Sequence, residues 1–203
     1  MKLRTLMWLI TLVAGLAFGG LIIWRTTLSP TPTAQTAGLQ TGQALIGGPF
    51  QLIDQESRPT TEALLQGHWT VVFFGFTACP DVCPTTLQAL AQTEAQLGAR
   101  AERMRVVFIS LDPERDKPAQ LRAYLSGPAM PSHVIGLTGS AEQVAAAARA
   151  YRVFYERAGT GPNYSINHST AAYLMNPQGR FERVLAFGMT PQDMARQIRE
   201  AMG

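Results

Sequence analysis

After about residue 50, two patterns of hydrophobic and polar residues follow one another along the chain. Apolar runs rich in Val, Ile and Phe predict β-strands, and they cover residues 50–53, 70–76, 104–111, 133–137, 152–156, 171–175 and 181–187. Apolar residues at three- and four-residue spacing predict amphipathic helices, which cover residues 84–98, 117–126, 140–150 and 191–202, with a further helical turn within Thr60–Leu65.

The order of these elements predicts an α/β fold of the thioredoxin-like type. Strands that alternate with helices form a largely parallel sheet, and the turn Asn176-Pro177-Gln178-Gly179 joins the last two strands as a hairpin before the final helix. Ligands collect at the carboxyl ends of the parallel strands in such sheets. The loop after residues 70–76 is therefore the expected position of a site.

A separate apolar segment lies at the N-terminus. The twenty residues Thr5–Trp24 carry no charge, and their number matches the length needed to cross a bilayer. Because Lys2 and Arg4 precede them, the positive-inside tendency predicts a single transmembrane helix with the N-terminus inside. Small residues at Ala17 and Gly19 leave a cleaved signal peptide as the alternative.

The chain divides into three parts on this basis. Residues 1–28 are predicted to be a membrane anchor, with the transmembrane helix at about 5–24. Residues 29–43, rich in Thr, Pro, Ala and Gly, are expected to form a flexible tether. Residues 44–203 have the size of one ordinary domain.

The charge of the chain argues against nucleic acid as a partner. There are 17 Lys and Arg against 14 Asp and Glu. Lys2, Arg4 and Arg25 flank the apolar segment, so 14 basic residues balance 14 acidic residues in the rest. Binding of a phosphate backbone needs a clustered basic face, which a neutral domain of mixed charges does not predict.

The two cysteines of the chain, Cys79 and Cys83, stand four residues apart at a predicted strand-to-helix junction. Residues at i and i+4 share one face of a helix, so the sulfurs could bind one ion or form a disulfide. Free N–H groups of the first helical turn stabilise negative charge, which predicts easier ionisation of both thiols. Burial as two small core residues is disfavoured because Pro80 and Pro84 mark a loop and a helix start.

One of the three histidines is predicted to meet the thiols. His168 lies in the polar segment 164–170 before a late strand, which should face the start of the first long helix in a thioredoxin-like sheet. His68 and His133 stand at the amino ends of strands and are expected to point away from the cysteine loop.

The chain resembles the Sco (Sco/SenC) family of membrane-anchored copper proteins, whose fold is a thioredoxin or peroxiredoxin variant. The resemblance covers nearly the whole domain and rests on four blocks: Phe74-Gly75-Phe76-Thr77-Ala78-Cys79-Pro80-Asp81-Val82-Cys83-Pro84, Ser110-Leu111-Asp112-Pro113-Glu114-Arg115-Asp116, Gly136-Leu137-Thr138-Gly139, and His168-Ser169 with Tyr173-Leu174. It implies that Cys79, Cys83 and His168 bind one copper ion per chain. Thioredoxin-type oxidoreductases usually have two residues between their cysteines and a proline before the facing strand; here there are three residues, and Ser169-Thr170 replace the proline.

The donor set agrees with copper on chemical grounds. Two soft thiolates and one imidazole suit Cu(I), and they make magnesium and calcium poor candidates. Either Cu(I) or Cu(II) is expected as the form in use. Zinc remains the alternative, although a structural zinc site usually has four protein ligands.

Two aspartates are candidates for supporting roles around the predicted site. Asp112 should end beside the cysteine loop and orient a ligand or a backbone donor; the alternative is a turn or capping aspartate before Pro113. Asp81, between the cysteines, is expected to contact a partner or to favour the helix dipole.

Two classes of function stay open. The resemblance implies a metallochaperone, not an enzyme, that receives copper from a separate donor and delivers it to the copper centre of cytochrome c oxidase subunit II or a related cuproprotein. The protein would be held in the cytoplasmic membrane by one helix, with its domain in the periplasm. The alternative is a membrane-anchored thiol–disulfide oxidoreductase or peroxidase, in which Cys79 attacks and Cys83 resolves.

Overall fold

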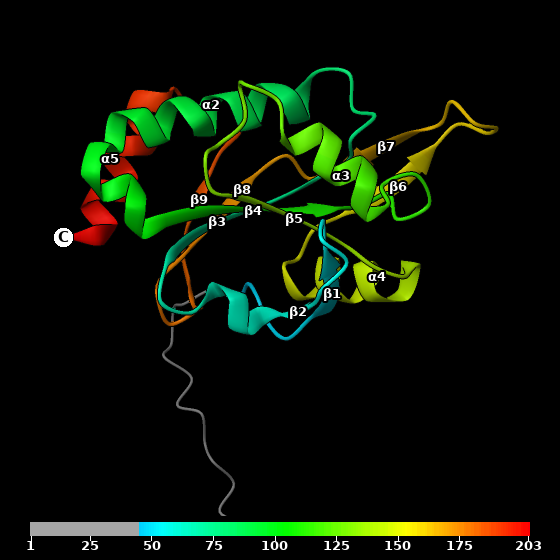
Figure 1. Ribbon diagram of the computed structural model, residues 1–203, viewed down its shortest axis with the longest axis horizontal. Helices are drawn as coiled ribbons and strands as arrows, with labels where there is room; N and C mark the ends of the chain where they lie inside the picture. Colours follow the sequence, from blue (N-terminus) through cyan, green and yellow to red (C-terminus); the bar gives the residue numbers. More distant parts are fainter. Residues whose placement is uncertain (1–44) are drawn as a thin grey trace, which may run out of the picture. The chain divides into compact units, whose positions relative to one another are not determined.

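The computed structural model describes residues 45–203 (Figure 1). Its elements in chain order are β1 (Gln51–Asp54), β2 (Pro59–Thr61), η1 (Glu62–Leu65), β3 (Trp69–Gly75), α2 (Val82–Leu97), η2 (Gly98–Arg103), β4 (Met104–Ser110), α3 (Pro118–Leu125), β5 (Val134–Thr138), α4 (Ala141–Ala150), β6 (Tyr155–Ala158), β7 (Ser165–His168), β8 (Ala172–Met175), β9 (Phe181–Leu185) and α5 (Pro191–Met202).

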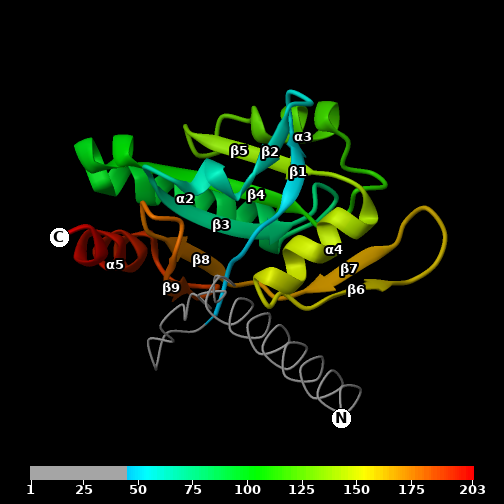
Figure 2. The same ribbon diagram turned by 90° about the horizontal axis from the view of Figure 1, so that it is seen from below.

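Seven strands form one mixed sheet in the order β2-β1-β5-β4-β3-β8-β9. The three central strands β5, β4 and β3 are parallel, and the pairs toward both edges are antiparallel. Helices α2, α3 and α5 cover one face, while α4 and η1 lie on the other (Figures 1 and 2). Strands β6 and β7 form a separate antiparallel hairpin that extends beyond the sheet. This arrangement confirms the thioredoxin-like α/β prediction.

The centre of the core is β3, which is buried along its whole length. Because successive strand side chains point to opposite faces, Phe73 and Phe74 serve two different layers. The Phe73 ring lies 6.1 Å from that of Phe108 on β4, and the Phe74 ring lies 5.3 Å from that of Tyr151, which follows α4. Burial on both faces explains why this strand is a continuous apolar run in the sequence.

The strand at residues 165–168 was not predicted from the sequence. Residues 164–170 were expected to be a polar loop, but Ser165–His168 pairs with Tyr155–Ala158 as a hairpin. The partner strand also begins later than the predicted 152–156 segment. In β7 only Ile166 is buried, because the hairpin lies outside the main sheet. Its sequence therefore lacks the apolar pattern by which a strand is predicted.

The predicted transmembrane helix and tether lie outside the described residues. Within residues 45–203, the helices are too short or too polar to span a bilayer.

Gly75, the last residue of β3, packs directly against the side chain of Cys83. A Cβ atom there would lie 2.8 Å from the Cys83 sulfur and 2.8 Å from Cε2 of Phe108, which is closer than van der Waals contact allows. Both neighbours are fully buried. Only glycine lets the Cys83 sulfur lie against the end of β3.

We therefore expect Gly75→Ala to lower the free energy of unfolding by about 1–3 kcal/mol, the usual cost of overpacking a core. Urea unfolding of the two proteins measures this difference. Gly127→Ala is the matched control, because its Cβ would have no neighbour closer than 3.7 Å. Equal losses of stability in the two variants would contradict the proposed packing of Cys83 against Gly75.

Candidate metal centre

The two cysteines lie where β3 leads into α2. The β3 end is joined to β4 by a hydrogen bond from the Leu111 N–H to the Gly75 carbonyl, 2.7 Å, and the Cys79 N–H closes a turn onto the Phe76 carbonyl, 3.2 Å. Cys83 is the second residue of α2. Both cysteines are free thiols, Cys79 half-buried and Cys83 fully buried.

The first turn of α2 is directed at the Cys79 sulfur. The backbone N–H of Cys83 donates to Sγ of Cys79 over 3.4 Å, and it is one of the N–H groups that a helix leaves without a partner in the helix. The helix end therefore supplies a donor to Cys79, as the sequence predicted for the junction.

The environment of Cys83 opposes ionisation of its thiol, whereas the sequence predicted easier ionisation of both cysteines. Desolvation by burial is the largest cause that raises the pKa of the Cys83 thiol, and the neighbouring Cys79 and Asp116 raise it further. A hydrogen bond with the backbone of Phe76 acts in the opposite direction but is outweighed. The expectation of easier ionisation was wrong for Cys83, because complete removal from water outweighs the helix end.

His168, the last residue of β7, contacts Cys83. Its Nε2 atom lies 3.7 Å from Sγ of Cys83, and its Nδ1 atom lies 2.8 Å from the backbone carbonyl of Ser169. A carbonyl only accepts hydrogen bonds, so Nδ1 carries the proton in the neutral ring and Nε2 directs its lone pair to the sulfur. Burial lowers the pKa of His168, which also favours the neutral ring.

An open depression exposes this group of side chains. Its volume is about 270 Å³, and its lining includes Cys79, Asp81 and His168 together with Phe76. The ring of Phe76 meets the imidazole edge-on, with the centroids 6.0 Å apart. Cys79 and His168 are therefore reachable from solvent, whereas Cys83 lies behind them.

The distance between the two donor atoms fits a single metal ion. With metal–sulfur and metal–nitrogen bonds of about 2.3 Å and about 2.0 Å, the 3.7 Å between Sγ of Cys83 and Nε2 of His168 corresponds to an angle of about 120° at the metal. Cys79 is not yet in place as a third donor, and within residues 45–203 no three His, Cys, Asp or Glu side chains are already gathered closely enough to hold an ion.

The loop before Cys79 is held by Asp116, a residue to which the sequence analysis assigned no role. This carboxylate is fully buried and accepts from the Thr77 N–H (2.9 Å), the Thr77 hydroxyl (2.6 Å) and the Ser110 hydroxyl (2.6 Å). Its position in the second sequence block, near the start of α3, was the one available signal. Burial of a charge is tolerated because each of these donors is directed at it.

Asp112 bonds to the hairpin that carries His168, not to the cysteines. It is buried, and its carboxylate accepts from the hydroxyl of Tyr164 over 2.5 Å and from Arg115. The guanidinium groups of Arg115 and Arg157 stack on the Tyr164 ring, 3.7 Å and 3.6 Å from its centroid. Asp112 thus ties the segment after β4 to the residue that immediately precedes β7.

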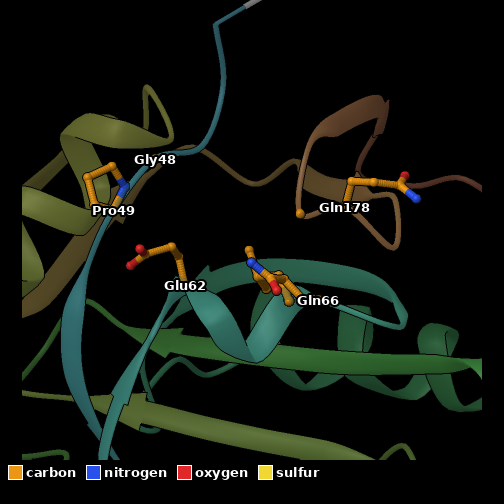
Figure 3. Close-up of a pocket in the computed structure, with 7 residues that line it drawn as sticks. Gly48, Pro49, Glu62, Gln66 and Gln178 are labelled. Carbon is orange, nitrogen blue, oxygen red and sulfur yellow. The ribbon is translucent and has the colours of Figure 1, made fainter.

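The remaining sequence candidates make no hydrogen bond with Cys83 or His168 among the described residues. Asp81 is exposed at the N-cap position of α2, caps no backbone N–H with its side chain, and accepts from the Thr85 hydroxyl at 3.2 Å. His68 and His133 line a different depression, as predicted from their place at the amino ends of strands. A further depression, lined by residues such as Glu62, Gln66 and Gln178, contains no thiol or imidazole (Figure 3).

The role of Asp116 can be tested by substitution. We expect Asp116→Asn to lower the free energy of unfolding by about 2 kcal/mol or more, because an amide NH₂ group would face donors that now share a carboxylate. Denaturant unfolding checks the loss, and exposed Asp81→Asn, expected to change stability by no more than about 0.5 kcal/mol, is the matched control. A stability change at Asp116 as small as that at Asp81 would show that the carboxylate does not hold the loop.

Solved structures resemble this chain over most of the described residues. The structure of Bradyrhizobium japonicum ScoI with copper bound is 38% identical, with a TM-score of 0.69 and coverage of 76% of this chain and 98% of that chain. Yeast Sco1 with copper bound is 34% identical, with a TM-score of 0.72 and coverage of 78% and 89%.

Sequence relatives agree with the structural ones. The SCO2-like protein RC0895 of Rickettsia conorii is 31% identical over 98% of this chain and 99% of its own length. The mouse protein SCO2 homolog, mitochondrial, is 39% identical over 77% of this chain, and the match spans 63% of the mouse protein. The family model described as SCO1/SenC matches residues 39–203, so the chain belongs to the SCO1/SenC family.

Proposed function

We propose that this protein is a copper metallochaperone that takes part in cytochrome c oxidase assembly and delivers copper to the copper centre of oxidase subunit II. The observation that carries the proposal is the contact between Cys83 and His168, in which the Nε2 atom lies 3.7 Å from the sulfur. The Ser169 carbonyl holds the imidazole in the required tautomer. Relatives solved with copper bound support copper as the cargo.

In this proposal one copper ion per chain binds to Cys79, Cys83 and His168. Thiolate sulfur and imidazole nitrogen form a soft donor set that favours Cu(I) over oxygen-seeking cations. Because burial keeps Cys83 protonated when no metal is bound, copper loading displaces its proton, and copper affinity should fall as the pH falls.

The unequal exposure of the ligands suggests a direction for transfer. Cys79 and His168 line the open depression, while Cys83 is buried. A donor group of an acceptor protein would therefore reach the ion from the Cys79 and His168 side and replace those ligands first. Cys83 would be the last ligand to release the ion.

The ligand set gives a direct prediction for the protein loaded with Cu(I) under reducing conditions. X-ray absorption should show two sulfur neighbours and one nitrogen neighbour, and His168→Ala should lose the nitrogen neighbour with at least about tenfold weaker binding, the equivalent of about 1.4 kcal/mol. His133→Ala is the matched control, because His133 lies at the opposite edge of the sheet. A copper site with only oxygen and nitrogen neighbours, or unchanged binding in His168→Ala, would overturn the ligand assignment.

A thiol–disulfide oxidoreductase is the second candidate, favoured by the different exposure of the two cysteines. Half-buried Cys79 could attack a partner disulfide, and buried Cys83 could then displace the reduced partner and leave a Cys79–Cys83 disulfide. That disulfide would remove both thiolates from copper binding. Cys83→Ser separates the candidates: an oxidoreductase should trap a mixed disulfide through Cys79, whereas a chaperone should lose copper without trapping a partner.

We further propose that residues 1–28 anchor the protein in the cytoplasmic membrane through a helix at about 5–24, that residues 29–43 are a tether, and that the domain at 44–203 lies in the periplasm. Support comes from the uncharged segment Thr5–Trp24 and the basic residues that precede it. An anchored domain would reach a membrane-bound acceptor by diffusion in two dimensions.

The topology can be measured with reporters fused after Gly203. We expect alkaline phosphatase, which is active in the periplasm, to be active in the fusion, and we expect the full chain to resist extraction with alkaline carbonate. Lys2→Glu with Arg4→Glu should reduce the reporter activity, because the positive flank would be lost. A mature chain that begins after Gly19 and leaves the membrane freely would favour the signal-peptide alternative and end the anchored model.

A further inference from the structure

Basic side chains lie close together at the amino ends of the three parallel strands. The cysteines lie beyond the opposite, carboxyl end of β3. Thr70 of β3 is level with Arg105 of β4, and Val106 of β4 is level with Val134 of β5. His133 is therefore level with Arg105, and His68 stands two residues before Thr70. Side chains that are level on neighbouring parallel strands, or two residues apart on one strand, project from the same face of the sheet. Arg105 donates to the carbonyl of Leu64 in η1. The shared face is therefore the one that carries η1.

Arg105 makes two hydrogen bonds but has no carboxylate partner among residues 45–203. Its Nη1 atom donates to the Leu64 carbonyl at 2.9 Å, and its Nη2 atom lies 2.5 Å from Nδ1 of His68. In residues 45–203 no salt bridge to Arg105 is formed. The side chain is partly buried, and desolvation lowers its pKa. A partly buried charge without a counterion is costly, so an anion is the partner that this site lacks.

The histidines beside Arg105 can add hydrogen-bond donors. A guanidinium only donates, so Nδ1 of His68 accepts from Arg105 and the proton of the neutral ring is on Nε2. His68, Arg105 and His133 line one depression of about 330 Å³. The site therefore combines a fixed positive charge with an imidazole N–H and a second imidazole that can donate.

The same contacts disfavour a metal cation. The Arg105 contact leaves the Nε2 atom of His68 protonated, so that nitrogen has no lone pair for a metal, and the guanidinium would repel a cation. Glu102 is the one carboxylate among the residues that line the depression. It is exposed, and no hydrogen bond or ion pair in the described part of the chain joins it to Arg105.

We propose that His68, Arg105 and His133 form a binding site for a phosphate oxyanion. A guanidinium binds phosphate oxygens through paired N–H donors, and the flanking imidazoles can donate to the remaining oxygens. The phosphate can be free in solution or belong to a lipid headgroup, because both present the same oxygens. Seven residues of β3 separate this edge from the cysteine loop, a distance of about 20 Å. Phosphate bound here would leave the cysteine edge free, so this site is independent of the proposed copper function.

The test uses the full chain in micelles of dodecyl maltoside, a detergent without phosphate, with its histidines labelled with ¹⁵N. Inorganic phosphate is titrated into one sample in phosphate-free buffer, and phosphatidylglycerol is added to a second sample. We expect saturable shifts of the His68 and His133 ring nitrogens, with His168 unaffected. Shifts with inorganic phosphate identify a free oxyanion as ligand, and shifts only with phosphatidylglycerol identify a lipid headgroup.

Substitutions decide whether Arg105 is responsible. Arg105→Gln should weaken binding by about tenfold or more, as expected for loss of a charged hydrogen bond, and Glu102→Gln should strengthen it because a competing negative charge is removed. Arg149→Gln, which removes an exposed positive charge from α4, should have no comparable effect. The proposal is overturned if neither phosphate source shifts the two histidines, or if Arg149→Gln weakens binding as much as Arg105→Gln in proteins with the same circular dichroism.

Discussion

The candidate metal centre depends first on the buried carboxylate of Asp116. Three donors from two places in the chain, the N–H and hydroxyl of Thr77 and the hydroxyl of Ser110, converge on it. A buried charge is stable only when such donors remain in position, so the carboxylate couples the ends of β3 and β4 to the loop that carries Cys79. With Gly75 leaving room for the Cys83 sulfur, this network determines where both thiols lie before any ligand arrives.

The second half of the centre is positioned by a different set of contacts. His168 belongs to a hairpin outside the main sheet, and the residue just before that hairpin strand, Tyr164, is bonded to Asp112 and stacked between two arginines. Asp112 and Asp116 stand four residues apart, and the Asp116 N–H donates to the Asp112 carbonyl at 2.8 Å. One short segment after β4 therefore supports both the cysteine loop and the histidine hairpin. This explains how Cys83 of α2 and His168 of the separate hairpin meet at 3.7 Å.

The two ends of the parallel strands have opposite chemistry. At the carboxyl ends, the thiols and a neutral imidazole form a soft, partly buried donor set suited to a thiophilic ion. At the amino ends, Arg105 and two histidines form a set of hydrogen-bond donors suited to an anion. Because strand direction puts these groups at opposite ends of the parallel strands, a ligand at one end leaves the other end accessible.

The sequence by itself determined the elements and the principal reactive residues. Apolar runs identified the central strands, because β3 and β4 are buried on both faces, and the strand-to-helix pattern placed Cys79 in the loop before α2 and Cys83 in its first turn. Tertiary structure decided the rest. The β7 hairpin, the role of Asp116 and the raised pKa of Cys83 arise from contacts between residues such as Thr77 and Asp116, 39 positions apart, and Cys83 and His168, 85 positions apart. Desolvation and hydrogen-bond partners depend on which distant residues surround a group, and local sequence patterns do not contain that information.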